Sequence, residues 1–271
     1  MATADSHYRS LDAKPPRLRS LASVSEPLPP LGDGGVTHRI VVGRAPGTLL
    51  DSLDPIVGLA DDVIPSHAGF GMHPHRGIEI VTYLWQGGLR HEDSQGNSAV
   101  LEAGGAERVF TGRGIAHAEL PTGPADTLGL QLWLALSPAE QGETPEFQEV
   151  RPVDLPAVEV GAARLRVVAG VVDGRASPLC TRRPLLYLDV TLAPGGEFLH
   201  PVPTEYAGLL YVLSGKGNFG EPPRSAGPRQ RLVLGPGDTF PAQAGTAGLR
   251  FVLAAGQPHR EEPIWNGSFV D

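Results

Sequence analysis

Short apolar runs, separated by turn residues, recur along most of the chain. The clearest are Ile78–Leu84, which ends at Gln86-Gly87-Gly88, and Leu128–Leu136. Such runs, at roughly 8–12-residue spacing with glycine-rich turns between them, are typical of the strands of a β-sandwich or β-barrel. No segment of the first half shows sustained helical periodicity. The pattern therefore predicts an all-β fold.

The strand pattern resumes after a polar, proline-rich segment at 138–156, which divides the chain into two halves. Val81–Gly87 resembles Leu209–Gly215 in its order of apolar and small residues, at an offset of 128 positions (211 − 83 = 128). This repeat predicts two barrels in one chain. We expect a tail or surface strap at 1–35, a first barrel at 36–137, a linker at 138–156 and a second barrel at 157–271.

Composition and charge exclude several classes of protein. The chain has 271 residues, 41% hydrophobic and 19% charged, as in a globular domain. Its net charge of −8 argues against a general nucleic-acid binder, which needs a basic face to neutralise phosphate. A single cysteine, Cys180, excludes an intrachain disulfide, and no apolar run is long enough to span a membrane. Because no secretory signal is recognisable, we expect a cytoplasmic protein.

Two pairs of potential metal ligands stand out in the first half. His73 and His75 flank Pro74, and His117 precedes Glu119 by two positions. Residues two apart on a strand share a face, and the 42 positions between the pairs (117 − 75 = 42) allow strands that bring them together. Each histidine alone is more often a hydrogen-bonded or surface residue, and Pro74 also suits a plain edge strand. Their joint occurrence favours one mononuclear metal site.

The residue types also bear on which metal would bind. Three imidazoles and one carboxylate suit a divalent first-row ion, and iron(II) is favoured where coordination positions stay open. At the offset of 128, His73 and His75 fall on Pro201 and Pro203. The second half therefore repeats the scaffold without the ligands, which predicts one metal ion per chain.

Four motifs, in order, resemble the signature of the pirin family, a branch of the cupin superfamily. They are Gly71-Met72-His73-Pro74-His75-Arg76-Gly77, Glu79-x-Val81-Thr82-Tyr83, His91-x-Asp93-Ser94-x-Gly96-Asn97 and Thr111-Gly112-Arg113-Gly114-Ile115-x-His117-x-Glu119-x-Pro121. The resemblance continues more weakly in the second half, for instance at Gly235-Pro236-Gly237-Asp238. It implies two stacked cupin barrels, with metal bound in the first barrel alone.

The resemblance also implies a ligand set. Carried over by position, the metal ligands are His73, His75, His117 and Glu119, and the usual metal is iron. Nickel, manganese, cobalt, copper and zinc are alternatives for the same ligands. Glu79 stands where many other cupins have a carboxylate ligand, but similarity to pirins assigns it instead to orienting a ligand imidazole.

Two classes of function remain open after this resemblance. Some pirins resemble quercetin 2,3-dioxygenases, which implies a flavonol-like small-molecule substrate, a metal that acts as Lewis acid, and Glu119 alternating between ligand and general base. Arg76 and Arg113 would then frame the pocket mouth, although arginines in glycine-flanked turns are more often solvated structural residues. Other pirins resemble redox-sensitive, metal-dependent regulators that bind a transcription factor or a metabolic enzyme. Both classes share the motifs, and the acidic net charge argues against direct DNA binding in either.

Overall fold

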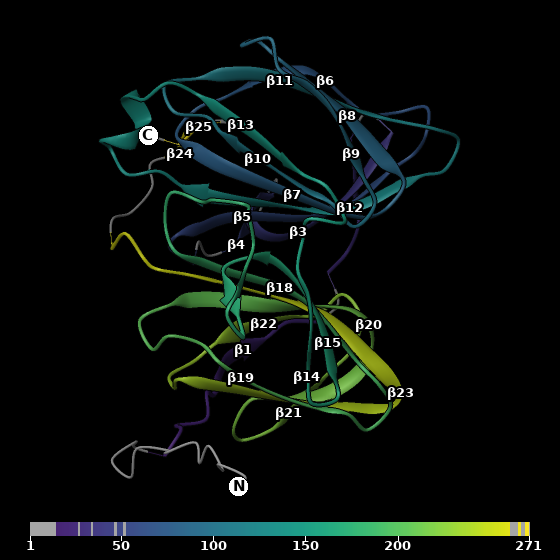
Figure 1. Cartoon of the computed structure of the whole chain (residues 1–271), viewed down its shortest axis with the longest axis vertical. Coiled ribbons are helices and arrows are strands. Elements are labelled where there is room, and N and C mark those ends of the chain that lie inside the picture. Colours follow the sequence, from purple (N-terminus) through teal and green to yellow (C-terminus); the bar gives the residue numbers. More distant parts are fainter. Residues whose placement is uncertain are drawn as a thin grey trace, which may run out of the picture.

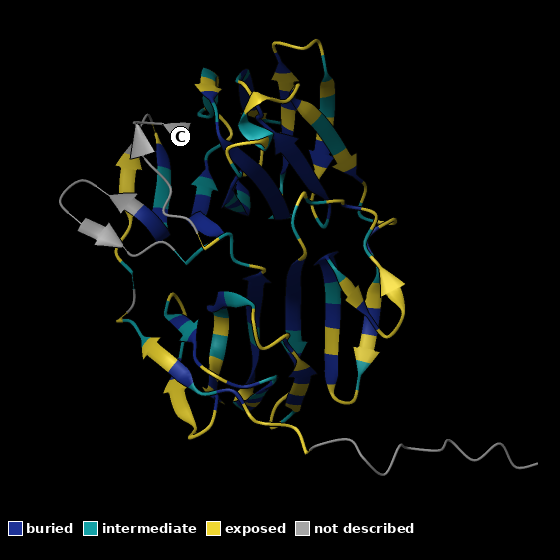
Figure 2. Cartoon of the chain, turned by 90° about the vertical axis from the view of Figure 1, so that its left-hand side faces the viewer, coloured by how far each residue is buried: buried dark blue, intermediate teal, exposed yellow. Residues whose placement is uncertain are grey.

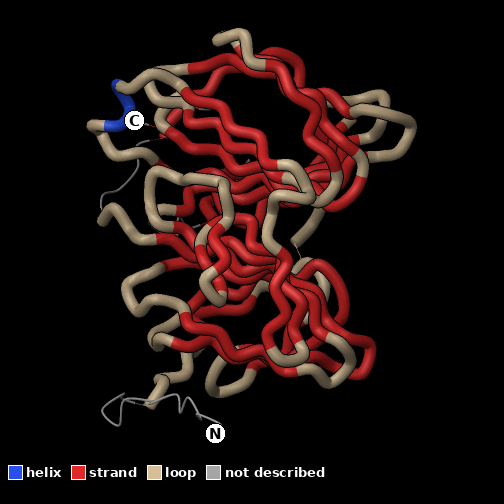
Figure 3. Tube along the Cα trace, in the orientation of Figure 1, coloured by secondary structure: helices blue, strands red, loops and turns tan. Residues whose placement is uncertain are grey.

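The protein consists of two β-barrels, one above the other in Figure 1. The computed structural model describes residues 15–26, 28–33, 35–45, 48–50, 53–260, 265–266 and 269–270. Strands and loops form nearly all of this part of the chain (Figure 3), and its one helical segment is the 3-10 helix η1 (Glu140–Gly142). Over the same residues, no helix is long and apolar enough to cross a membrane. The predicted all-β fold with two barrels is confirmed.

The first barrel is made of two sheets. The larger sheet contains β2 (Leu31–Asp33), β3 (Val36–Ala45), β4 (Thr48–Leu50), β5 (Ile56–Ile64), β7 (Ile78–Gln86), β10 (Ala106–Phe110), β12 (Thr127–Ala135) and β13 (Glu146–Val150). The smaller sheet contains β6 (Phe70–His75), β8 (Gly88–Asp93), β9 (Ser98–Glu102) and β11 (Ile115–Pro121). The strand orders are β13-β10-β7-β12-β5-β3-β2, with β4 beside β3, and β6-β11-β8-β9.

The second barrel is formed mainly by one nine-stranded sheet. Its strands are β1 (Leu21–Val24), β14 (Ala157–Val160), β15 (Ala163–Ala169), β18 (Leu185–Leu192), β19 (Glu197–Pro201), β20 (Ala207–Phe219), β21 (Arg224–Ala226), β22 (Arg231–Leu234) and β23 (Thr239–Gly256). They pair in the order β1-β22-β20-β23-β18-β15-β14, while β19 pairs with β23 and β21 with β20. Two separate two-stranded antiparallel sheets pair β16 (Val171–Val172) with β17 (Arg175–Ala176) and β24 (Trp265–Asn266) with β25 (Phe269–Val270).

Strand β7 is buried on both faces, because one face lines the first barrel and the other meets the second barrel. Ile78 and Ile80 pack inside the first barrel. Val81 and Tyr83, which point the other way, belong to a core shared with the second barrel, where Tyr187 packs against them. Buried strands accordingly lie on both sides of the level at which the barrels meet (Figure 2).

A reciprocal pair of hydrogen bonds joins the barrels. The Tyr83 hydroxyl donates to Asp189 Oδ2 at 2.8 Å, and the Tyr211 hydroxyl donates to Asp61 Oδ2 at 2.7 Å. Both residue types recur at the offset seen in the sequence (211 − 83 = 128 and 189 − 61 = 128). The two repeats therefore contribute equivalent residues to the interface, which is approximately two-fold symmetric.

Two segments predicted to lie outside the barrels contribute strands to them. Residues 15–26 lie against the second barrel, where β1 pairs with β22, Leu21 enters the core and Arg19 donates to the Gly235 carbonyl at 3.0 Å. In the segment 138–156, β13 pairs with β10 of the first barrel. Its Pro145 and Pro152 flank β13, so neither removes a ladder hydrogen bond.

Candidate metal centre

The three histidines of the predicted ligand set meet inside the first barrel. The pairing of β6 with β11 places His73 opposite His117 and His75 opposite Ile115. The ring centroids of His73 and His117 are 4.5 Å apart, those of His73 and His75 4.8 Å, and those of His75 and His117 5.2 Å. One nitrogen from each ring lies within 4.8 Å of the other two, a spacing that a single metal ion can span. These residues come together as predicted.

His117 is the least satisfied of the three. Its side chain is fully buried, and neither Nδ1 nor Nε2 has a hydrogen-bond partner. Burial, followed by the neighbouring His73 and His91, lowers the pKa of His117 to about 3, so its imidazole is neutral at neutral pH. Buried polar atoms normally have a partner, and a neutral imidazole is the form that binds metal. A metal ion therefore fits the chemistry of this site.

The other two imidazoles are held from outside the cluster. His73 Nδ1 lies 2.7 Å from the Gly71 carbonyl oxygen; if Nδ1 carries the proton, Nε2 is left free to bind a metal. The ring of His75 packs edge-on against Trp133, with centroids 5.0 Å apart. The Gly71 carbonyl therefore orients the His73 imidazole, and the Trp133 ring orients the His75 imidazole.

Glu119 is buried beside the histidine cluster but is occupied by hydrogen bonds. Thr82 Oγ1 donates to Glu119 Oε1 at 3.3 Å, and Gln131 Nε2 donates to Glu119 Oε2 at 2.9 Å. Gln131 is fixed in turn, since its Oε1 accepts from Trp133 Nε1 at 2.9 Å. Among the described residues, the group within 4.8 Å consists of the histidines without Glu119. Its role as fourth ligand stays a prediction.

Two further polar residues, His91 and Glu107, lie near Glu119, and the sequence analysis did not assign either of them to the site. His91 lies opposite Glu119 in the β8–β11 pairing. Its Nε2 is 3.4 Å from Asp93 Oδ2, and its Nδ1 is 3.5 Å from Glu107 Oε1. Glu107 is completely buried, neither of its oxygens has a hydrogen-bond partner, and burial raises its pKa to about 6. The available signal was His91-x-Asp93, a second same-face pair like the one at His117.

Glu79 does not orient an imidazole, and that prediction is wrong. Thr82 faces the interior of the first barrel, so Glu79, three positions earlier, faces the second barrel. Its carboxylate accepts from Arg108 Nε and, at 3.2 and 3.1 Å, from the backbone N–H of Arg182. Burial raises the pKa of Glu79, and Arg108 opposes that rise. Glu79 therefore belongs to an ionic network between the barrels.

The two arginines predicted at the pocket mouth differ in their surroundings. Arg113 is exposed in the turn before β11, and its backbone N–H donates to the Glu143 carbonyl at 2.9 Å. Arg76 is half-buried directly after β6, one residue beyond His75. Their contact with a substrate stays a prediction.

The sequence matches the model of the pirin family over residues 37–134 and that of the pirin C-terminal cupin domain over residues 187–271. A pirin-like protein of Solanum lycopersicum is 39% identical over 241 residues, which cover 88% of this chain and 81% of that protein. The chain belongs to the pirin family. The first match contains every histidine of the candidate metal centre, and the second confirms a cupin domain in the second half of this pirin.

Solved structures share the fold. A quercetin 2,3-dioxygenase from Acinetobacter baumannii gives a TM-score of 0.81 at 24% identity, covering 93% of this chain and 92% of that one. The bacterial pirin YhhW from Escherichia coli, in complex with nickel(II), gives a TM-score of 0.69 at 22% identity, covering 89% and 98%. The predicted pair of cupin barrels is thereby confirmed.

Proposed function

We propose that this pirin holds one divalent metal ion, iron(II), on His73, His75 and His117, with Glu119 as the fourth ligand. The observation that carries the proposal is the buried His117 imidazole, which has no hydrogen-bond partner and faces two more imidazoles. Coordination would use the lone pair of one ring nitrogen and replace one of the two missing hydrogen bonds. Nickel(II), present in the complex of the related E. coli pirin, is the alternative ion.

We further propose that the protein is an oxygenase of flavonol-like substrates. The support is the fold shared with a quercetin 2,3-dioxygenase, together with a buried carboxylate beside three imidazoles. The bound ion would supply a Lewis acid and a template for a substrate oxygen.

Glu119 would accept the hydroxyl proton of the substrate. Thr82 and Gln131 hold its two oxygens, and Trp133 holds Gln131, so the proton acceptor is positioned before substrate binds. Glu119, Thr82 and His91 are buried, and this burial limits the competition of bulk water for the proton. These hydrogen bonds support the proposed role of Glu119 as general base.

Oxygen consumption tests this proposal. The iron-loaded protein is measured with a panel of flavonols, beside free iron at the same concentration. The wild type should consume oxygen, and Glu119→Gln should be slower by roughly 10²–10⁴-fold at equal metal content, because the amide cannot take a proton. Glu92→Gln, an exposed change on the same sheet, is the matched control and should turn over normally.

A wild-type protein that consumes no oxygen above the free-iron level with any flavonol would contradict the enzymatic proposal. The regulatory alternative predicts that result. It also predicts a protein partner, captured from the protein's own lysate, whose binding changes between iron(II) and iron(III).

A further inference from the structure

A cavity of about 550 Å³ lies between the barrels, on the face of β7 turned away from the histidines. Its first-barrel wall contains Tyr83 and Trp85 of β7, with Ala103 and Gly104 from the turn before β10. Its second-barrel wall is formed by β14, β15, β18 and β23. The volume falls in the range of roughly 300–1,000 Å³ that is usual for small-molecule sites.

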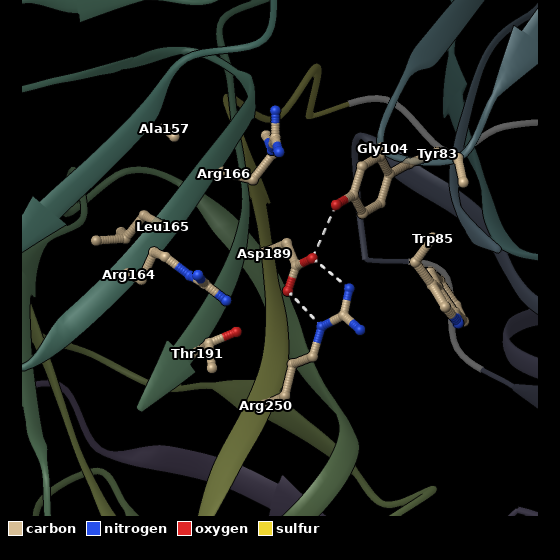
Figure 4. Close-up of a pocket in the computed structure, with 11 residues that line it drawn as sticks. Tyr83, Trp85, Gly104, Ala157, Arg164, Leu165, Arg166, Asp189, Thr191 and Arg250 are labelled. Carbon is tan, nitrogen blue, oxygen red and sulfur yellow. Dashed lines mark hydrogen bonds and ion pairs between the residues drawn. The ribbon is translucent and has the colours of Figure 1, made fainter. Parts of the chain in front are cut away.

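Three guanidinium groups line the second-barrel wall (Figure 4): Arg164 and Arg166 from β15, and Arg250 from β23. The strand register places Arg164, Thr191 and Arg250 in one row across β15, β18 and β23. Asp189 is the one carboxylate among the lining residues. The wall therefore carries three positive charges and one negative charge.

The Asp189 carboxylate already has hydrogen-bond partners within the protein. Arg250 donates to both oxygens of Asp189, at 3.0 and 2.6 Å, and the Tyr83 hydroxyl adds a third bond at 2.8 Å. Arg250 and Asp189 thus neutralise each other and fix one side of the cavity.

The remaining two arginines have no carboxylate partner. Arg166 Nη1 donates to two backbone carbonyls, those of Pro152 at 2.6 Å and Leu155 at 3.2 Å. Arg164 is exposed and makes no hydrogen bond or ion pair with the described part of the chain; its cross-strand neighbour Glu159 lies beyond the 4.0 Å of an ion pair. In a protein of net charge −8, this leaves two uncompensated positive charges in one cavity.

We propose that this cavity binds a small polyanion that carries at least two phosphate or carboxylate groups. Guanidinium groups recognise both oxyanions through charge-assisted, often bidentate hydrogen bonds. The Thr191 hydroxyl lies between two of the arginines in the row and adds a donor. The Trp85 ring, whose centroid is 5.7 Å from Arg250 Cζ, offers a flat wall for the carbon skeleton of the ligand.

The test is a calorimetric titration of the full-length protein at low ionic strength. Pyrophosphate and citrate are the probes for the two kinds of oxyanion, and inorganic phosphate is the probe with a single anionic group. We expect one saturable site for pyrophosphate or citrate, with weaker binding of phosphate. Arg164→Gln should weaken binding about tenfold, as expected for the loss of one charge-assisted contact. Arg224→Gln, an equal change of charge at an exposed position on β21, should leave it unchanged.

Three results would overturn the proposal. One is the absence of saturable binding of any probe. Another is equal weakening by Arg164→Gln and Arg224→Gln, which would mean general attraction to positive charge. The third concerns the proposed metal ion, because both polyanions are chelators: chelator-treated protein is titrated alongside, and binding that disappears with the metal would place the probes at the histidines. Binding that persists in the treated protein supports the cavity, whether or not the metal proposal holds.

Discussion

The two barrels share an arrangement of strands but differ in the side chains of their interiors. In the first barrel, His117 pairs with His73 on β6, and Glu119 pairs with His91 on β8. In the second barrel, the same places on β23 are taken by Phe240, which pairs with His200 on β19, and Ala242, which pairs with Phe219 on β20. The difference extends to the surrounding strands: Thr82, Glu107 and Gln131 correspond by pairing to Leu210, Leu232 and Leu253.

This comparison separates the scaffold from the site. The substituted positions of the second barrel belong to one apolar core, in which Phe198, Phe219 and Phe251 pack edge to face. Apolar burial of this kind stabilises a barrel without any ligand. The first barrel instead buries imidazoles and carboxylates, which cost free energy unless a partner satisfies them. The fold itself therefore does not require a polar interior.

A buried histidine on β19 of the second barrel, His200, sharpens the comparison. By strand pairing, His200 occupies the position equivalent to His73, and not Pro201 as the offset of 128 predicted. Its ring stacks on Phe198 with centroids 5.7 Å apart. Its opposite residue is Phe240, where the first barrel has His117. A single imidazole among apolar side chains does not make a metal site.

The largest expected effect follows from this difference. His117→Ala should remove nearly all bound metal, whereas His200→Ala, the matched change in the second barrel, should leave the metal content near one ion per chain. Metal analysis of both purified variants gives the stoichiometry, and circular dichroism should show the wild-type fold in both. An unfolded His117→Ala variant would mean that the ion is structural, and a wild-type content near two would mean that the second barrel also binds metal.

A smaller effect distinguishes the two faces of β7. Glu79→Gln should lower the free energy of unfolding by about 1.5–3 kcal/mol, since Arg108 would lose a buried charged partner. Metal affinity should stay unchanged, because the carboxylate faces the second barrel. Denaturant unfolding and a metal titration measure the two quantities, with the exposed Glu149→Gln as control. A loss of metal affinity of roughly 10–100-fold would return Glu79 to the neighbourhood of the ligands.

The contrast between Glu79 and the histidines also shows how far sequence reasoning reaches. The rule that residues two apart share a face, together with the pirin motifs, was enough to bring His73, His75 and His117 together. Glu79 was placed near the ligands by the family resemblance alone, and the rule could not correct this, because it does not say which face is which when both are buried. The positions of His91 and Glu107 near Glu119 follow from the pairing of strands that are distant in sequence. The cavity lined by Arg164, Arg166 and Arg250 forms where the two barrels stack, and this stacking leaves no local pattern in the sequence.

The smallest expected effect, that of Tyr83→Phe, belongs to a test of the approximate two-fold interface. Tyr83→Phe and Tyr211→Phe each remove one hydroxyl donor from a buried aspartate, but the two aspartates are supported differently. Asp189 keeps both hydrogen bonds from Arg250, at 3.0 and 2.6 Å. Within the described part of the chain, Asp61 keeps one longer contact, 3.5 Å to Arg39.

Tyr211→Phe should therefore lower the free energy of unfolding by about 1.5–3 kcal/mol and Tyr83→Phe by about 1 kcal/mol, as measured by denaturant unfolding. Because the two pairs share no partner, the double variant should show the sum of the single effects. Equal losses, or a larger loss for Tyr83→Phe, would mean that the arginines do not set the strength of these contacts. The two halves of the interface would then be energetically alike, although their side chains are arranged differently.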